Sequence, residues 1–266
     1  MNMNLDNRRA LVTGASAGLG EAIARMLAAE GAAVVVHGRN RARAEQVAAD
    51  IIASGGKADV AIGDLASDEG AAAVVAQALS GGEVDILVNN AGHYHHLDWH
   101  SATPQVWAES YQVNVVSAVR MIQALVPAMV ARGWGRVIQI GGGLAEQPTA
   151  QLPDYQATLA ARHNLAVSLA RRLKDTGVTS NIVAPGAILV PAVKELLEQI
   201  APARGWGESW EKIESGCVRD MVPNDIGRLG RAEEIAGAVT YLSSELAAYV
   251  SGATLRVDGG TVRSAF

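Results

Sequence analysis

The chain has 266 residues, of which 49% are hydrophobic and 18% charged, so it can bury a sizeable core. A formal net charge of −5 without a basic cluster argues against a nucleic-acid partner. A single cysteine excludes an intrachain disulfide, and no apolar run approaches the roughly 18 residues of a membrane span. We therefore expect a soluble, cytoplasmic protein without a membrane partner.

Short β-branched segments alternate with longer Ala-rich stretches along the whole chain. The pattern predicts strands at 9–13, 33–37, 58–62, 86–89, 136–140, 180–183 and 254–257, and helices at 18–30, 41–53, 104–132, 155–174 and 232–243. Strands separated by helices of this length indicate βαβ crossovers and a parallel sheet. We expect one Rossmann-type, doubly wound α/β domain over residues 1–266, with about seven strands and helices on both faces.

Residues 190–225 break this alternation, because the segment is long, partly polar and carries Trp206 and Trp210. A segment of this kind is typical of a lid, or an inserted helical pair, over a substrate site. The alternative is an exposed helical hairpin.

A glycine-rich loop follows the first strand and opens the first helix. Its sequence is Thr13-Gly14-Ala15-Ser16-Ala17-Gly18-Leu19-Gly20. Glycines at such a loop permit a tight turn and let backbone N–H groups approach a pyrophosphate at the helix N-terminus. The loop therefore predicts a dinucleotide site, with Gly14, Ser16, Gly18, Leu19 and Gly20 as candidate contacts.

Other segments accompany this loop at the ends of later strands. They are Asp64-Leu65, Asn89-Asn90-Ala91-Gly92, Pro185-Gly186 and the tail Ser251 to Gly260. In this combination the chain resembles the short-chain dehydrogenase/reductase family over nearly its whole length. The resemblance implies NAD(P)(H)-dependent oxidoreduction of a small carbonyl or alcohol by a homo-oligomer, expected to be a tetramer. It also implies that Asp64 meets the adenine, that Asn90 supports the ribose side and that Ile188 contacts the carboxamide.

The end of the second strand bears on which cofactor is used. An acid there would bind the ribose 2′-hydroxyl, whereas an arginine can accommodate a 2′-phosphate. The chain has His37-Gly38-Arg39 and no acid. Arg39 therefore favours NADP(H) over NAD(H), unless it is only a solvated arginine at the start of a helix.

Two of the four catalytic positions implied by the resemblance are altered. Asn114 and Tyr155 are present, but Gly142 stands where the family has serine and Leu159 where it has lysine. Val190 also departs from the usual threonine near the cofactor. The serine would hold the substrate oxygen, and the lysine would lower the pKa of the tyrosine and hold ribose hydroxyls.

These losses predict slow or atypical turnover. Lowering the pKa of a tyrosine from ~10 to ~7 takes about 4 kcal/mol, and a leucine supplies none of it. Alcohol oxidation should therefore suffer more than carbonyl reduction. Arg162 could reach back toward the site, or it could be a surface or subunit-interface residue. The triplet Gly141-Gly142-Gly143 could offer N–H groups to an oxyanion.

Residues 93–100 hold four of the six histidines and follow the Asn-Ala-Gly segment. His93 and His95 are candidate pocket-lining acids or bases, although plain surface-loop histidines are the simpler interpretation. Their spacing fits no standard zinc pattern, so we expect no metal. Two competing functions remain open, a nucleotide-binding protein without turnover and a redox-neutral enzyme of the same fold.

Overall fold

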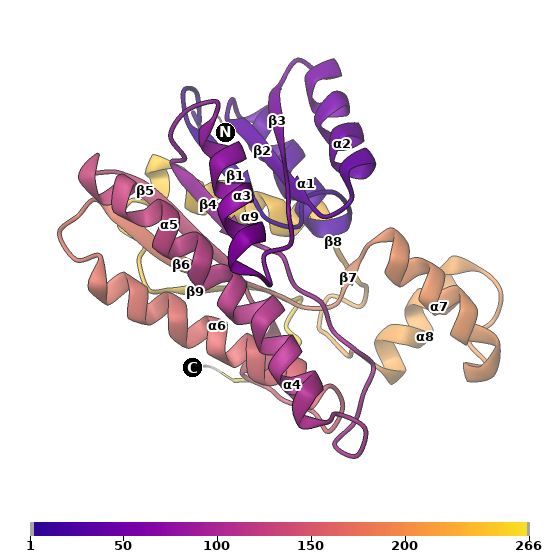
Figure 1. The fold of residues 1–266 in the computed structure, drawn as a ribbon. Helices are drawn as coiled ribbons and strands as arrows, with labels where there is room; N and C mark the ends of the chain where they lie inside the picture. The colour runs from indigo at the N-terminus through magenta and orange to yellow at the C-terminus, as the bar shows by residue number, and fades with distance from the viewer. Residues whose placement is uncertain (1–2, 265–266) are drawn as a thin grey trace.

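Seven parallel strands form the central sheet of the computed structural model, which describes residues 3–264 (Figure 1). Their order is β3-β2-β1-β4-β5-β6-β9. The strands are β1 (Arg9–Val12), β2 (Ala33–Gly38), β3 (Lys57–Ile62), β4 (Ile86–Asn89), β5 (Gly135–Ile140), β6 (Val178–Pro185) and β9 (Thr254–Val257). All seven predicted strands are confirmed, with ends that shift by at most two residues.

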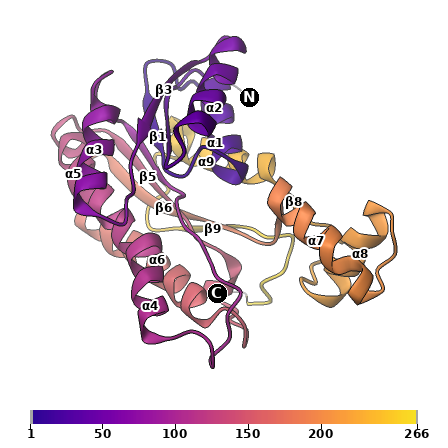
Figure 2. The same cartoon turned by 45° about the vertical axis from the view of Figure 1, so that its right-hand side comes forward.

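Helices cover both faces of this sheet (Figure 2). One face carries α1 (Gly18–Ala29), α2 (Arg41–Ala53) and α9 (Ala232–Ser243), and the other carries α3 (Asp68–Leu79), α5 (Ser117–Ala131) and α6 (Pro153–Arg172). Neighbouring residues of one strand enter opposite cores, as Leu11 and Val12 do. This two-sided burial explains why the central strands β1, β2 and β4 are mostly apolar, whereas the edge strands β3 and β9 are partly exposed.

One helix of this set, α3, was missed in the sequence. It begins at an N-cap, Ser67, whose hydroxyl accepts the N–H of Gly70 at 3.1 Å, and its first turn carries Asp68 and Glu69. Acidic residues are favourable there because the helix dipole is positive at that end. These start signals were present in the sequence and were overlooked.

The predicted helix 104–132 is interrupted. It runs as α4 (Pro104–Tyr111), a π-helical turn (Gln112–Val116) and α5, so the single regular helix expected there was wrong. The continuous stretch Pro104–Ala131 is long and apolar enough to cross a membrane by length and composition, which the search for unbroken apolar runs overlooked. Core helices of soluble proteins share that composition, and the buried side of α5 packs on the sheet.

Residues 190–225 form two helices, as one of the sequence interpretations had it. They are α7 (Pro191–Arg204) and α8 (Trp210–Asp220), followed by the short strand β8 (Gly230–Arg231), which pairs with β7 (Ile188–Leu189). Trp206 is buried between the helices and donates from Nε1 to Asp220 at 2.7 Å. The pair thus has a small core of its own and projects from the body of the molecule (Figures 1 and 2).

Candidate active site

The candidate site lies at the carboxyl ends of β1, β4, β5 and β6. The strand order reverses between β1 and β4, so the loops after these two strands diverge to opposite faces of the sheet. In open α/β sheets such a switch point is where a crevice for a ligand forms.

The glycine loop after β1 requires its glycines. Gly14 and Gly18 have φ of +67° and +59°, a backbone region that residues other than glycine rarely adopt. A β-carbon on Gly14 would lie 3.0 Å from the α-carbon of Ala91, so that carbon would fill the space where the two loops meet. Gly20 is packed just as closely against Gly14 and Asn90. The loop therefore has the close backbone approach that a dinucleotide cradle needs.

The loops after β1 and β4 are held together by hydrogen bonds. The Thr13 hydroxyl accepts the N–H groups of Asn90 and Ala91 at 3.0 and 2.9 Å. The Asn90 side chain donates in return to the Thr13 carbonyl at 2.9 Å. The predicted motif residues of these two loops are thus adjacent, with Asn90 turned toward the glycine loop.

His37, which the sequence analysis named only as part of the second strand, fixes the loop from the other side. The Gly14 N–H donates to His37 Nδ1 at 3.0 Å, and His37 Nε2 lies 3.1 Å from the Gly63 carbonyl. Nδ1 must therefore be the acceptor and Nε2 the protonated nitrogen. Burial lowers the pKa of His37, which favours this neutral form.

Arg39 stands at the end of β2, exposed beside the glycine loop. Ser16 packs against Gly38, where a β-carbon would come within 2.7 Å of the Ser16 hydroxyl oxygen. Asp64 is also exposed and accepts the Ala66 N–H at 3.0 Å, while Leu65 is buried. The structure therefore brings the predicted adenosine-end residues to one edge of the crevice.

Asn114 joins the catalytic region to the loop after β4. Its side chain accepts the His93 N–H and donates to the His93 carbonyl, each at 2.9 Å. It also donates to the Thr158 hydroxyl at 3.0 Å, and Thr158 donates to the Tyr155 carbonyl at 2.7 Å. Asn114 therefore connects the 93–96 loop to the first turn of α6, where Tyr155 lies.

Tyr155, Leu159 and Arg162 follow one another on the same face of α6, four and three residues apart. Tyr155 is half-buried, and its ring centroid lies 5.3 Å from that of Tyr94. Burial raises the pKa of Tyr155, whereas the charge of Arg162 lowers it. Leu159 is buried and offers no charge to the tyrosine.

Arg162 is buried, with 4% of its surface exposed, so the surface reading of this residue was wrong. Its guanidinium donates to four backbone carbonyls, those of Asn89, Ala91, Asn114 and Ile140. Burial lowers the pKa of Arg162 to about 10, so the side chain is still charged at neutral pH.

Each glycine of the triplet 141–143 leaves room for a side chain from another segment of the chain. The β-carbon position of Gly141 is crowded by His163, that of Gly142 lies 3.1 Å from Leu159 Cδ1, and that of Gly143 lies 2.9 Å from Val262. The Gly141 N–H already donates to the Val183 carbonyl at 2.8 Å. Gly142 and Leu159, the two positions expected from the sequence to depart from the family, thus lie next to each other.

The histidine segment places two rings together beside the tyrosine. His93 Nε2 lies 3.0 Å from His95 Nε2, and Tyr94 bridges His96 and Tyr155 through ring contacts. Burial and the charges of His95 and Arg39 lower the pKa of His93. No group of three metal-ligating side chains occurs within residues 3–264.

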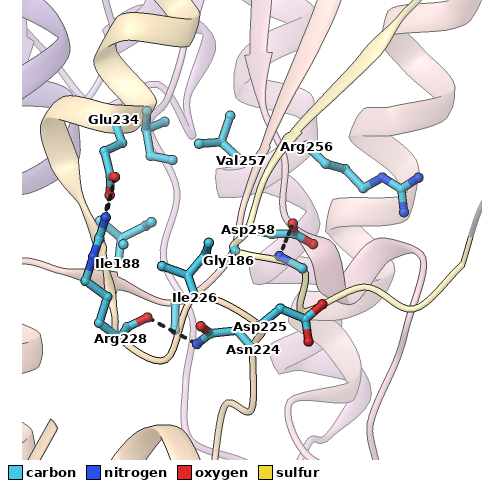
Figure 3. Close-up of a pocket in the computed structure, with 15 residues that line it drawn as sticks. Gly186, Ile188, Asn224, Asp225, Ile226, Arg228, Glu234, Arg256, Val257 and Asp258 are labelled. Atoms are coloured by element: carbon cyan, nitrogen blue, oxygen red, sulfur yellow. Dashed lines mark hydrogen bonds and ion pairs between the residues drawn. The ribbon is translucent and has the colours of Figure 1, made fainter. Parts of the chain in front are cut away.

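Pro185, Gly186 and Ile188 lie at the far end of the crevice. Gly186 packs against Asp258, so a β-carbon there would come within 2.9 Å of the Asp258 carbonyl. Beside Gly186 and Ile188 is a hollow of about 530 Å³, bordered by the ion pair of Arg228 with Glu234 at 2.7 Å (Figure 3). Neither Tyr155 nor Asn114 lines this hollow, so it is separate from the candidate catalytic residues.

Comparison with known proteins identifies the family of the chain. Residues 8–201 match the short chain dehydrogenase family. An uncharacterized oxidoreductase of Bacillus subtilis, YvaG, is 37% identical over 269 residues, covering 100% of both chains. The crystal structure of a 3-oxoacyl (acyl-carrier-protein) reductase from Agrobacterium tumefaciens with NADP bound is 37% identical, with a TM-score of 0.87 over 97% of this chain and 96% of that one.

A second structure is similar over a still larger share of the chain. L-sorbose reductase from Gluconobacter frateurii, complexed with NADPH and L-sorbose, is 32% identical and has a TM-score of 0.93, over 99% of this chain and 100% of that one. With the parallel sheet, the glycine crevice and the Asn114–Tyr155 connection, these matches show that the chain belongs to the short-chain dehydrogenase family and is an oxidoreductase of that type.

Proposed function

We propose that the chain transfers hydride between NADP(H) and a small carbonyl or alcohol, with NADP(H) favoured over NAD(H). The observation that carries this proposal is the crevice itself. The glycine loop, Asn90 and Arg39 lie at the carboxyl ends of the strands. Asn114 connects the loop after β4 at this edge to the first turn of α6, which carries Tyr155. The structural relatives named above with NADP or NADPH bound support it.

The residues present fit the cofactor. The missing β-carbons of Gly14 and Gly20 let the glycine loop pack closely against the loop after β4. The exposed Arg39 follows Gly38, which packs against Ser16, and offers a cation for a 2′-phosphate. When bound, NADP(H) supplies or accepts the hydride. Asp64, Leu65, Ala91, Pro185, Gly186 and Ile188 would complete the cradle from the neighbouring loops.

Tyr155 is the proton donor to the carbonyl oxygen in the reductive direction. The burial that raises the pKa of Tyr155 keeps the phenol protonated at neutral pH, which suits donation. Gly142 has no hydroxyl with which to hold the substrate oxygen. Orientation therefore falls to Tyr155 and to the loop that carries His93 and His95, which Asn114 fixes at its backbone.

The proposal is tested by cofactor titration. Fluorescence quenching should show NADPH binding more tightly than NADH, and Arg39→Ala should narrow the difference by about tenfold, the loss of one charged hydrogen bond. Arg41→Ala is the matched control, because Arg41 is an exposed arginine two residues on that pairs with Glu45 at 3.3 Å. Equal affinity for both cofactors in the wild-type protein contradicts the preference.

Turnover is then measured on a panel of ketoses, small ketones and the corresponding alcohols, with Tyr155→Phe as the inactive reference. NADPH consumption that Tyr155→Phe abolishes supports the proposal. Tight NADPH binding without turnover on any member would favour a nucleotide-binding protein without dehydrogenase activity, which the altered positions 142 and 159 also allow.

A further inference from the structure

The buried guanidinium of Arg162 is held by four carbonyls from three segments that are far apart in the sequence. Its Nη1 donates to the carbonyls of Ile140 at 2.8 Å and Asn89 at 3.4 Å, its Nη2 to Ala91, and its Nε to Asn114. An arginine has five N–H donors, so these bonds take four of them. The guanidinium therefore lies at the point where β4, β5, α6 and the π-helical turn meet.

The Asn114 carbonyl that Arg162 binds lies within the π-helical turn. The N–H of Ser117 donates to Gln112, five residues back, instead of continuing the regular pattern. Such a bulge interrupts the ladder of main-chain bonds in an α-helix and leaves a carbonyl open to another donor. Arg162 Nε takes the Asn114 carbonyl, while the Asn114 side chain fixes the 93–96 loop.

No carboxylate is among the hydrogen-bond partners of Arg162 within residues 3–264. Carbonyl dipoles satisfy its donors but do not neutralise its charge, and an unpaired buried charge is costly. Tyr155 lies seven residues earlier on the same helix face, and its charge acts on Arg162. Tyr94, whose ring contacts Tyr155, acts in the opposite sense and raises the pKa of that tyrosine. An anion formed at Tyr155 would thus be the natural counter-charge for this cation.

We propose that Arg162 is the positioning residue that takes over the electrostatic part of the missing lysine, by stabilising the phenolate form of Tyr155. This inference rests on the proposed function, because it concerns the same proton transfer. In alcohol oxidation the substrate hydroxyl gives its proton to the Tyr155 oxygen, while its carbon gives a hydride to NADP⁺. Reduction reverses both transfers, so protons and electrons balance.

Arg162 does not take over the other part of the lysine. Four of its N–H groups are bound to carbonyls, so they are not free to hold ribose hydroxyls. Leu159, between Tyr155 and Arg162 on the helix face, is packed against Gly142 and adds no charge. A lysine at position 159 would place a second cation on the same face, next to Arg162.

The test measures the ionisation of Tyr155 in the protein without cofactor, by ¹³Cζ NMR of labelled tyrosine assigned with Tyr155→Phe. Arg162→Gln keeps an N–H donor but removes the charge, and should raise the Tyr155 pKa by about 1–3 units. Arg162→Lys keeps the charge and should leave that pKa near its wild-type value. Arg136→Gln is the matched control, because it removes another buried arginine, at a position about 13 Å along β5 from Ile140, whose carbonyl Arg162 binds, and it should change nothing at Tyr155.

A second measurement needs no substitution at Arg162. In the wild-type protein the ¹³Cζ resonance of Arg162 should move as Tyr155 ionises, and Tyr155→Phe should remove that movement. An unmoved Arg162 resonance, or an unchanged Tyr155 pKa in a folded Arg162→Gln variant, overturns the inference. Because neither readout uses cofactor or substrate, a failure of the proposed function would appear separately, as absent NADPH turnover.

Rescue supplies the activity readout. Arg162→Gln should lower alcohol oxidation at pH 8 by about tenfold for each unit by which the Tyr155 pKa rises. Adding Leu159→Lys to Arg162→Gln should raise the rate by a larger factor than Leu159→Lys does in the wild-type background, where Arg162 already supplies the charge and the lysine adds only its contact with the ribose hydroxyls. A rate that Leu159→Lys raises equally in both backgrounds contradicts a shared role.

Discussion

Two buried arginines occupy opposite ends of the same sheet, and their surroundings differ. Arg136, at the start of β5, is 1% exposed and donates to the carbonyls of Gly135 at 3.0 Å and of Ser244 and Gly177 at 3.4 Å. It also pairs with Glu245 at 3.4 Å and stacks 4.3 Å from the Trp134 ring, which Arg8 covers as well. Within residues 3–264, Arg162 has only backbone carbonyls as hydrogen-bond partners.

The difference separates a structural charge from a functional one. Burial lowers the pKa of Arg136, but the Glu245 carboxylate and the Trp134 ring compensate its charge. The charge of Arg162 is not neutralised by a carboxylate partner, and it acts on Tyr155, the candidate proton donor. A buried cation with a full set of partners stabilises the fold, whereas one without a counter-ion changes the acidity of its neighbour.

The largest effect is expected at Arg136. Arg136→Gln should lower the free energy of unfolding by about 3 kcal/mol, because it removes a ring contact and an ion pair and leaves buried carbonyls without donors. Chemical denaturation measures this loss. Both KM and the pKa of Tyr155 should stay as in the wild-type protein. An altered Tyr155 pKa in this variant would break the distinction between the two arginines.

The next effect is on catalysis and not on stability, and it is seen in the pH dependence of the rate. Because burial raises the pKa of Tyr155, the phenolate fraction increases about tenfold for each pH unit below that pKa. Alcohol oxidation, which needs the phenolate, should therefore rise about 100-fold between pH 7 and pH 9, while carbonyl reduction, which needs the phenol, stays nearly level. Initial rates in both directions measure this. Brisk oxidation that is already level at pH 7 would show that another base acts, and His93 and His95 would be the next residues to replace.

The smallest effect is expected from restoring the serine. Gly142→Ser should cost about 1–2 kcal/mol, because its β-carbon lies 3.1 Å from Leu159 Cδ1 and the leucine must move. Pairing it with Leu159→Ala should recover part of that cost, and thermal unfolding of the two single variants and the double variant gives the coupling. Strictly additive losses would show that positions 142 and 159 do not contact each other in solution.

The sequence by itself determined the scaffold, and it predicts a departure at two catalytic positions. Apolar central strands in βαβ order require two-sided burial, and the positive φ of Gly14 and Gly18 requires glycine, so both follow from local chemistry. The absence of serine at 142 and lysine at 159 is equally visible, since it depends only on spacing from Tyr155. The α3 helix and the long apolar stretch 104–131 were within reach of the sequence but were missed.

Only the tertiary structure decided what Arg162 and His37 do. Helical spacing made Arg162 a candidate, but the same spacing suited a surface arginine. Its burial depends on carbonyls from Asn89, Ala91, Asn114 and Ile140, which meet only after the sheet and α6 have packed. His37 likewise depends on Gly14 and Gly63 from different loops. A local pattern cannot encode such partners, because the cost of burying a charge or an imidazole is set by groups distant in the chain.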